Sequence, residues 1–232
     1  MKNYLIIGGS SGIGKALVHN LVSSNHYVHA TYYKNAIKTK STAMAYYPLD
    51  VKDESISFDF LPEQLDGLVY CPGSINLLPF TRINPKDFIN DFELQVIGAI
   101  KVIQKVLPKL KASENSSIVL FSTVAVQTGF NFHSQVATSK GAIEGLTKAL
   151  ATELAPKIRI NAIAPSLTDT PLAAKFLGNN EKKHANAQRH PLKKIGDPNN
   201  IAEIAAFLLS DKASWITGQI IHVDGGIGSL KI

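Results

Sequence analysis

Residues 6–17 read IIGGSSGIGKAL, and this stretch decides the fold. Gly8, Gly12 and Gly14 follow a short apolar run and open a segment with the apolar spacing of a helix. Glycines in such a turn let the backbone bend sharply and approach a pyrophosphate group, whose charge is favoured at the N-terminus of a helix. The stretch therefore predicts a strand, a phosphate-binding turn and a helix in direct succession.

Further apolar runs recur along the chain, most of them followed by a longer segment with helical spacing. They lie at residues 27–33, 45–49, 67–71, 117–122, 158–164 and 219–223. Strands that are apolar throughout and alternate with helices indicate a parallel sheet covered on both faces. No linker or repeat interrupts the pattern. We therefore expect an α/β fold, a three-layer doubly wound parallel β-sheet of the Rossmann type, in a single domain over residues 1–232.

Two connections in this pattern are short. Few residues separate Tyr33 from Ala45, and residues 53–65 carry Pro62 in their interior. A parallel crossover needs about a dozen residues or more, usually as a helix. We therefore expect reduced helices or loops at these two places.

The composition excludes several classes of protein. Cys71 is the only cysteine, and the seven histidines are scattered, so we expect neither an intrachain disulfide nor a metal site. There is no signal peptide and no apolar run of about 18 residues, which predicts a cytoplasmic protein that does not enter a membrane. The net charge is +6, with a cluster of basic residues between Lys182 and Lys194. A solvated face or a phosphorylated ligand explains such a cluster, whereas nucleic acid is not expected because no aromatic residues are interleaved for base stacking.

The glycine spacing G-x-x-x-G-x-G resembles that of the short-chain dehydrogenase/reductase family. The resemblance extends to LDV at 49–51, RINAIAPSLTDTPL at 159–172 and the long run from Gly196 to Gly226, and so covers essentially the whole chain. It implies an oxidoreductase that transfers a hydride between a nicotinamide cofactor and a small carbonyl or alcohol substrate. It also implies self-association as a dimer or tetramer, with a homotetramer as the usual family form.

The resemblance implies a set of residues that bind the cofactor. They are Gly8, Ser10, Ser11, Gly12, Ile13, Gly14, Tyr32, Lys34, Asp50, Val51, Cys71, Pro72, Gly73, Lys140, Pro165, Leu167 and Thr170. An acid at the end of the second strand selects NAD, while a basic residue suits the 2′-phosphate of NADP. Here that strand ends ATYYKN, with Tyr32 at the discriminating position and Lys34 close by. We therefore expect NADP(H) in preference to NAD(H).

The family's catalytic residues can be placed on this sequence one by one. Its lysine is matched by Lys140, its serine by Thr123, and its helical asparagine by Gln95. Its tyrosine, four residues before the lysine, is the proton donor that carbonyl reduction needs. Val136 stands at that position, and no tyrosine lies between residues 71 and 232.

Three groups are candidates to replace this proton donor: His133, Tyr70, or Lys140 acting through a water molecule. The alternative is a non-catalytic dinucleotide-binding protein with a regulatory or scaffold role. The polar segment 175–196 falls where the family carries a mobile loop over the substrate, so it is either a lid or a solvated insertion.

Overall fold

The computed structural model describes residues 1–39 and 41–231 of the chain. Seven parallel strands form one sheet in the order β3-β2-β1-β4-β5-β6-β7. Their bounds are β1 Asn3–Ile7, β2 Tyr27–Tyr32, β3 Met44–Pro48, β4 Gly67–Tyr70, β5 Ser116–Phe121, β6 Ile158–Pro165 and β7 Ile220–Val223. The strand order reverses at β1, where β2 lies on one side and β4 on the other. The predicted fold, a doubly wound parallel sheet of the Rossmann type, is therefore confirmed.

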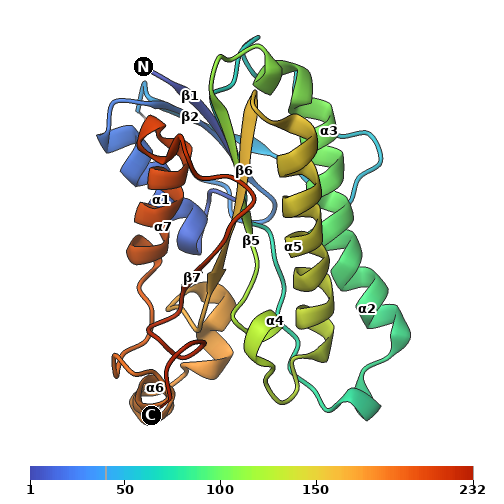
Figure 1. Cartoon of the computed structure of the whole chain (residues 1–232), viewed down its shortest axis with the longest axis vertical. Coiled ribbons are helices and arrows are strands. Elements are labelled where there is room, and N and C mark those ends of the chain that lie inside the picture. The colour runs from blue at the N-terminus through green and yellow to red at the C-terminus, as the bar shows by residue number, and fades with distance from the viewer. Residues whose placement is uncertain (40, 232) are drawn as a thin grey trace.

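Helices cover both faces of this sheet (Figure 1). One face carries α1 (Gly12–Ser23) and α7 (Pro198–Leu209), and the other carries α2 (Pro85–Phe92), α3 (Gly98–Lys111) and α5 (Ser134–Leu154). Shorter elements are α4 (Ala125–Thr128), α6 (Asn180–Gln188) and the 3-10 turns η1 (Phe80–Arg82), η3 (Pro171–Phe176) and η4 (Asp211–Ala213). No helix among the described residues is long and apolar enough to cross a membrane.

The strands are apolar throughout because both faces are buried. In β1, Leu5 and Ile7 belong to the hydrophobic cluster beneath α3 and α5, whereas Tyr4 and Ile6 belong to the cluster beneath α1 and α7. All four side chains are at most 1% exposed. Period-two alternation thus sends successive apolar side chains into two different cores.

The two short connections contain no helix among the described residues. Between β3 and β4 the chain runs as turns and bends, and Phe58, Leu61 and Leu65 enter the core cluster beneath α3. These side chains bury the apolar surface that a covering helix would otherwise bury. The prediction of reduced connections is confirmed.

A π-helical segment, η2 (Glu93–Ile97), joins α2 to α3 without a break. The Tyr70 hydroxyl donates a hydrogen bond of 2.6 Å to the carbonyl oxygen of Leu94 inside this segment. At Gly98 a Cβ atom would lie 2.4 Å from the same hydroxyl oxygen, so this close approach requires glycine. Widened turns of this kind often occur at functional sites, and η2 carries Gln95.

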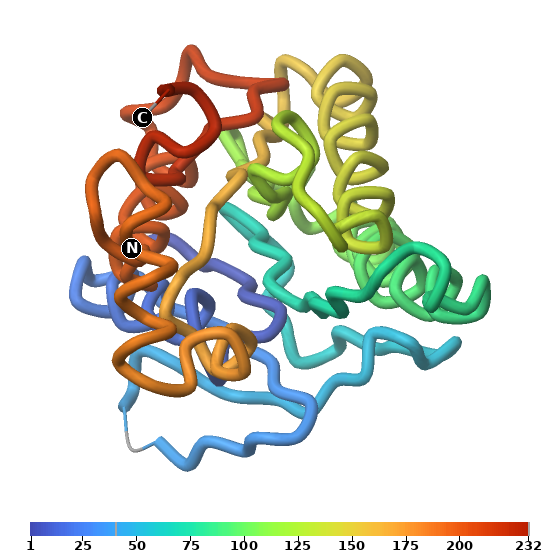
Figure 2. The backbone as a smooth tube through the Cα atoms, turned by 90° about the horizontal axis from the view of Figure 1, so that it is seen from below, coloured from blue at the N-terminus to red at the C-terminus, as the bar shows by residue number. Residues whose placement is uncertain are grey.

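The strands end together at one edge of the sheet, which Figure 2 shows from below. In that view the segments that follow β4 and β5 face α6 and the C-terminal segment across the sheet edge. In open parallel sheets, ligands bind outside the carboxyl ends of the strands, near the point where the order reverses. The fold therefore places a candidate site between these segments.

Candidate active site

A large pocket, of about 1390 Å³, opens at the carboxyl ends of the strands. Except for Tyr70, every residue predicted from the sequence to serve catalysis or cofactor binding lines it. These are Gly8, Ser10, Ser11, Gly12, Ile13, Gly14, Tyr32, Lys34, Asp50, Val51, Cys71, Pro72, Gly73, Gln95, Thr123, His133, Lys140, Pro165, Leu167 and Thr170. Residues up to 162 positions apart in the chain, from Gly8 to Thr170, are thus brought to one cavity.

The glycine turn between β1 and α1 has the shape of a phosphate cradle. Gly8 and Gly12 adopt left-handed backbone angles, with φ of +77° and +52°, and a Cβ atom on Gly14 would lie 2.3 Å from the Gly8 carbonyl oxygen. Ser11, at the N-cap of α1, makes no side-chain capping bond. The N–H groups of the first helical turn therefore remain available to an anion.

The pocket extends from this cradle past the ends of β2 and β3. Tyr32 ends β2, and the exposed Lys34 follows with its Nζ 5.5 Å from the ring centre of Tyr33. Asp50 accepts a 2.9 Å hydrogen bond from the backbone N–H of Lys52. Asp50 is the only carboxylate among the lining residues, so this end of the cavity combines two cations, Lys34 and Lys52, with a single acid.

Lys140 lies on the inward face of α5, where its Nζ donates a 2.8 Å hydrogen bond to the Phe121 carbonyl oxygen. Burial lowers the pKa of Lys140 to about 8, although the nearby carboxylate of Asp91 acts in the opposite direction. Val136 stands one helical turn earlier, 5% exposed, and lines the same pocket. The Lys140 ammonium and the apolar Val136 side chain are therefore neighbours on the α5 wall of the pocket.

Thr123 and His133 line the pocket from the segment between β5 and α5. The Thr123 hydroxyl oxygen accepts a 3.3 Å hydrogen bond from the Ala125 N–H, and its hydrogen is free for another partner. His133 directly precedes α5, and its Nδ1 lies 2.8 Å from the Asn131 carbonyl oxygen. Because a carbonyl oxygen only accepts, Nδ1 carries the hydrogen, and Nε2 of the neutral ring is an acceptor.

Tyr70 does not reach the pocket. Its side chain is 3% exposed, its hydroxyl donates to the Leu94 carbonyl oxygen, and it is absent from the pocket lining. Burial raises its pKa far above the ordinary value. The hypothesis that Tyr70 replaces the missing proton donor is therefore wrong, because the direction of β4 points this side chain into the core beneath α3.

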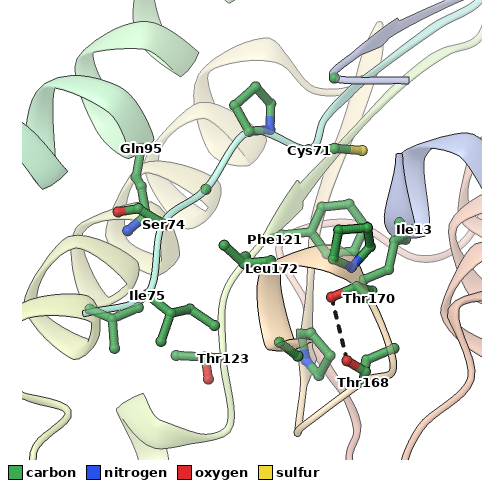
Figure 3. A pocket seen from close by; sticks show the side chains of 18 of the residues that line it. Ile13, Cys71, Ser74, Ile75, Gln95, Phe121, Thr123, Thr168, Thr170 and Leu172 are labelled. Carbon is green, nitrogen blue, oxygen red and sulfur yellow. Dashed lines mark hydrogen bonds between the residues drawn. The ribbon is translucent and has the colours of Figure 1, made fainter. Parts of the chain in front are cut away.

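A buried carboxylate, Asp91, organises the wall around Gln95. It accepts hydrogen bonds from the Gln95 amide at 2.8 Å, from the Ser139 hydroxyl at 2.6 Å and from the Ser74 hydroxyl. The other end of the amide, Gln95 Oε1, is buried and has no hydrogen-bond partner among the described residues. Figure 3 shows Gln95 and Ser74 on the same wall of the pocket. A buried oxygen without a partner is costly, so this atom is available to a bound group.

Sequence reasoning missed Asp91, although a signal was present: it lies four residues before Gln95, on the same helical face. It also missed the pairing of Ser166 with His190, which both line the pocket. No group of three or more His, Cys, Asp or Glu side chains is arranged to hold a metal ion in the part of the chain that the structure describes.

Comparisons with known proteins agree with this geometry. A family model described as enoyl-(acyl carrier protein) reductase matches residues 8–228. A tropinone reductase homologue from Arabidopsis thaliana is 34% identical over 239 residues, which cover 96% of this chain and 78% of the relative. A 3-oxoacyl-(acyl carrier protein) reductase from Thermotoga maritima is 35% identical over 166 residues, 71% of this chain and 66% of the relative.

Solved structures share the whole architecture. A short-chain dehydrogenase family protein from Francisella tularensis superposes with a TM-score of 0.86 at 28% identity, over 99% of this chain and all of that one. ElxO with NADP bound superposes with a TM-score of 0.88 at 26% identity, over 99% of this chain and all of that one. NAD(P) is the cofactor typical of such proteins. The glycine cradle, the common pocket and these relatives together show that the chain belongs to the short-chain dehydrogenase/reductase family.

Proposed function

We propose that the protein is an NADP(H)-dependent oxidoreductase that interconverts a small carbonyl compound and an alcohol. The observation that carries the proposal is the position of Thr123 and Lys140 in the pocket that also contains the Gly8–Gly14 cradle. The bound cofactor supplies or accepts the hydride. The protein's own residues bind and orient both reactants, and that orientation accounts for a large part of the rate.

The residues present fit a dinucleotide. A Cβ atom on Gly14 would lie 2.3 Å from the Gly8 carbonyl oxygen, so glycine there lets α1 pack closely against the turn, which is the role of the last glycine in a dinucleotide-binding turn. Asp50 and Val51 would hold the adenine end, and Cys71, Pro72 and Gly73 would hold the ribose and nicotinamide. Lys140 would bind the nicotinamide ribose, and Pro165, Leu167 and Thr170 would hold the carboxamide. Lys140 would therefore bind the cofactor in a catalytic and in a non-catalytic protein alike.

The end of β2 favours NADP(H). No carboxylate follows Tyr32 to accept bonds from the two ribose hydroxyls, while the exposed ammonium of Lys34 lines the pocket. A cation there stabilises a 2′-phosphate, and a carboxylate would repel it. The three pocket residues Ser10, Tyr32 and Lys34 would then surround that phosphate.

The proton donor is atypical. Val136 occupies the position of the family tyrosine, and its side chain has no proton to give. The loss of a general acid slows a reaction by about 10²- to 10⁴-fold when nothing replaces it. Thr123 provides the hydroxyl that binds the carbonyl oxygen of the substrate. Two candidate proton donors remain: His133, and the Lys140 ammonium acting through a water molecule held at Gln95 Oε1.

Val136 also favours a second function, a dinucleotide-binding protein without catalysis. The two functions differ in one experiment, which follows NADPH oxidation against a panel of ketones, aldehydes and quinones. The proposed enzyme oxidises NADPH with at least one of them, and Lys140→Ala abolishes the reaction. A scaffold raises its melting temperature with NADPH but turns over nothing, and gains weak reductase activity only after Val136→Tyr.

We also propose that the protein is a homo-oligomer. Ile89, Phe92 and Ile97 form an apolar stripe along α2 and η2, and they are 58%, 36% and 39% exposed. Their spacing places them on one helical face. Light scattering coupled to size-exclusion chromatography gives a dimer or tetramer for the wild type, and Ile89→Glu shifts it towards monomer, whereas the exposed control Lys105→Glu does not.

A further inference from the structure

We infer that Ser166 and His190 form a proton relay at the pocket, in which Ser166 donates to the carbonyl oxygen of the substrate and His190 resupplies the proton. This inference rests on the proposed function and names the group that stands in for the missing tyrosine. It adds two residues that the family resemblance does not supply, since Ser166 replaces a glycine there.

The pair has defined hydrogen-bond geometry. Ser166 Oγ lies 2.8 Å from His190 Nε2, and His190 Nδ1 lies 3.0 Å from the Asn186 carbonyl oxygen. Because that carbonyl oxygen can only accept, Nδ1 carries a hydrogen, and Nε2 of the neutral ring accepts from the Ser166 hydroxyl. His190 is 3% exposed, so the protein fixes its orientation. A reactive hydroxyl, a base and a third group that orients the base are the parts of a proton-transfer chain.

The pair is close to the residues that would hold the substrate. The Val124 N–H donates a 3.1 Å hydrogen bond to the Pro165 carbonyl oxygen. Thr123 precedes Val124 and Ser166 follows Pro165, so this bond joins the two hydroxyl-bearing segments. Thr123, Ser166 and His190 all line the same cavity. Thr123 and Ser166 therefore lie on adjacent segments of the pocket wall.

Protonation of the ring prepares the donor. Once Nε2 carries a hydrogen it donates to Ser166 Oγ, and the serine hydrogen is free to turn into the pocket. The carbonyl carbon then receives the hydride, forming its C–H bond, and the carbonyl π electrons move to oxygen. That oxygen takes the Ser166 proton while Ser166 Oγ takes the Nε2 proton. The products are the alcohol, oxidised cofactor and neutral His190, so charge and electrons balance.

Several charged and titratable groups lie on the elements around His190. On α6 these groups are Glu181, Lys182, Lys183 and His184. Arg189, Lys193 and Lys194 lie beside His190 in the sequence, Asp169 follows β6, and His222 and Asp224 precede the C-terminal turn. Lys183 is ion-paired with Asp169. The Asp224 carboxylate accepts from the N–H groups of Gly226 and Gly228, at 2.8 and 3.0 Å. A Cβ atom on Gly225 would lie 3.4 Å from the imidazole, so this turn closes over the ring.

The first test compares Ser166→Ala and His190→Gln with wild type across the pH range, with the best substrate of the carbonyl panel. His184→Gln is the matched control, because it removes an exposed histidine of the same segment that is outside the pocket lining. We expect kcat to fall by about 10²- to 10³-fold in both test variants, with loss of the same limb of the pH–rate profile. The control should keep the wild-type kcat and the wild-type pH–rate profile. All variants should bind NADPH with the wild-type dissociation constant.

The second test does not depend on turnover. Nitrogen NMR of the histidine rings, with the His190 signals identified by their loss in His190→Gln, should show that the neutral His190 ring carries its proton on Nδ1. Ser166→Ala, which retains the imidazole, should move the Nε2 resonance. A proton on Nε2, or no response to Ser166→Ala, overturns the pairing.

The outcomes separate the relay from the proposed function. Wild-type turnover with unchanged kcat and pH profile in Ser166→Ala overturns the relay alone. NADPH binding without turnover of any carbonyl compound overturns the enzymatic function, and the relay with it. Because Ser166 is only partly buried, Ser166→Ala is decisive even where His190→Gln fails to fold.

Discussion

Val136 lies one helical turn before Lys140 on α5, and both side chains are buried against the same pocket. The Lys140 ammonium donates a hydrogen bond to the Phe121 carbonyl oxygen, whereas the Val136 side chain has no polar atom. Under the proposed function, Lys140 binds the cofactor from α5, and another wall of the cavity provides the proton.

Lys140 should make stability depend on pH. Burial lowers its folded-state pKa to about 8 from 10.5. Between these values the unfolded chain binds more protons, so the free energy of unfolding rises with pH, by up to about 1.4 kcal/mol per pH unit. Urea unfolding of wild type and Lys140→Met should show the wild type gaining relative to the variant as pH rises through this window. A constant difference would show that Lys140 is not desolvated.

Gly14→Ala should damage the cradle. Its Cβ atom would lie 2.3 Å from the Gly8 carbonyl oxygen, so the turn must open. Overpacking of this kind costs about 1–3 kcal/mol and should also weaken NADPH binding. Gly145→Ala on α5 is the control, because nothing lies within 4 Å of its Cβ position. Alanine in a helix interior is favourable, so the control should unfold at the same temperature or higher. Equal effects of both variants would contradict the account.

Asp91→Asn should loosen the wall that holds Gln95. The carboxylate accepts three hydrogen bonds in a buried site, and an amide replaces one acceptor with a donor that faces other donors. Hydrogen bonds to a charged group contribute about 1.5–3 kcal/mol each, so stability should fall by a comparable amount. The exposed Glu153→Gln on α5 should change it by less than about 0.5 kcal/mol. Thermal unfolding of both variants measures these losses of stability. If Asp91→Asn is as stable as the wild type, Asp91 does not hold the wall through these hydrogen bonds.

Lys34→Gln should change cofactor preference without changing the fold. Loss of the cation removes its attraction to the 2′-phosphate, and NADPH affinity should fall by about tenfold at low ionic strength. NADH, which lacks that phosphate, should bind both forms equally. Fluorescence titration gives both dissociation constants. If the NADPH constant is unchanged, Lys34 is simply a solvated side chain.

The sequence predicts the fold well because the information is local. The apolar runs place all seven strands within about two residues of their observed ends, since strands buried on both faces need uninterrupted apolar residues. The glycine spacing places the cradle, and the family resemblance places residues as distant as Gly8 and Lys140 in one pocket.

The missed features depend on tertiary contacts. Asp91 meets Ser139 across 48 positions of sequence, and Ser166 meets His190 across 24. Nothing in either neighbourhood reveals that these side chains are buried together. The wrong expectation for Tyr70 has the same origin, because a strand end leaves open whether its last side chain faces the pocket or the core. Only the packed structure settles that the hydroxyl bonds to Leu94.

The most direct measurement is a single-turnover experiment with the wild-type protein. Protein loaded with NADPH is mixed with each carbonyl compound of the panel, and loss of the reduced-nicotinamide absorbance is followed with time, beside Lys140→Ala and Ser166→Ala. We expect that at least one compound oxidises NADPH in the wild type, that Lys140→Ala abolishes this reaction, and that Ser166→Ala slows it by about 10²-fold or more. If NADPH binds and remains reduced with every compound, the pocket is a binding site without catalysis, and the central claim is contradicted.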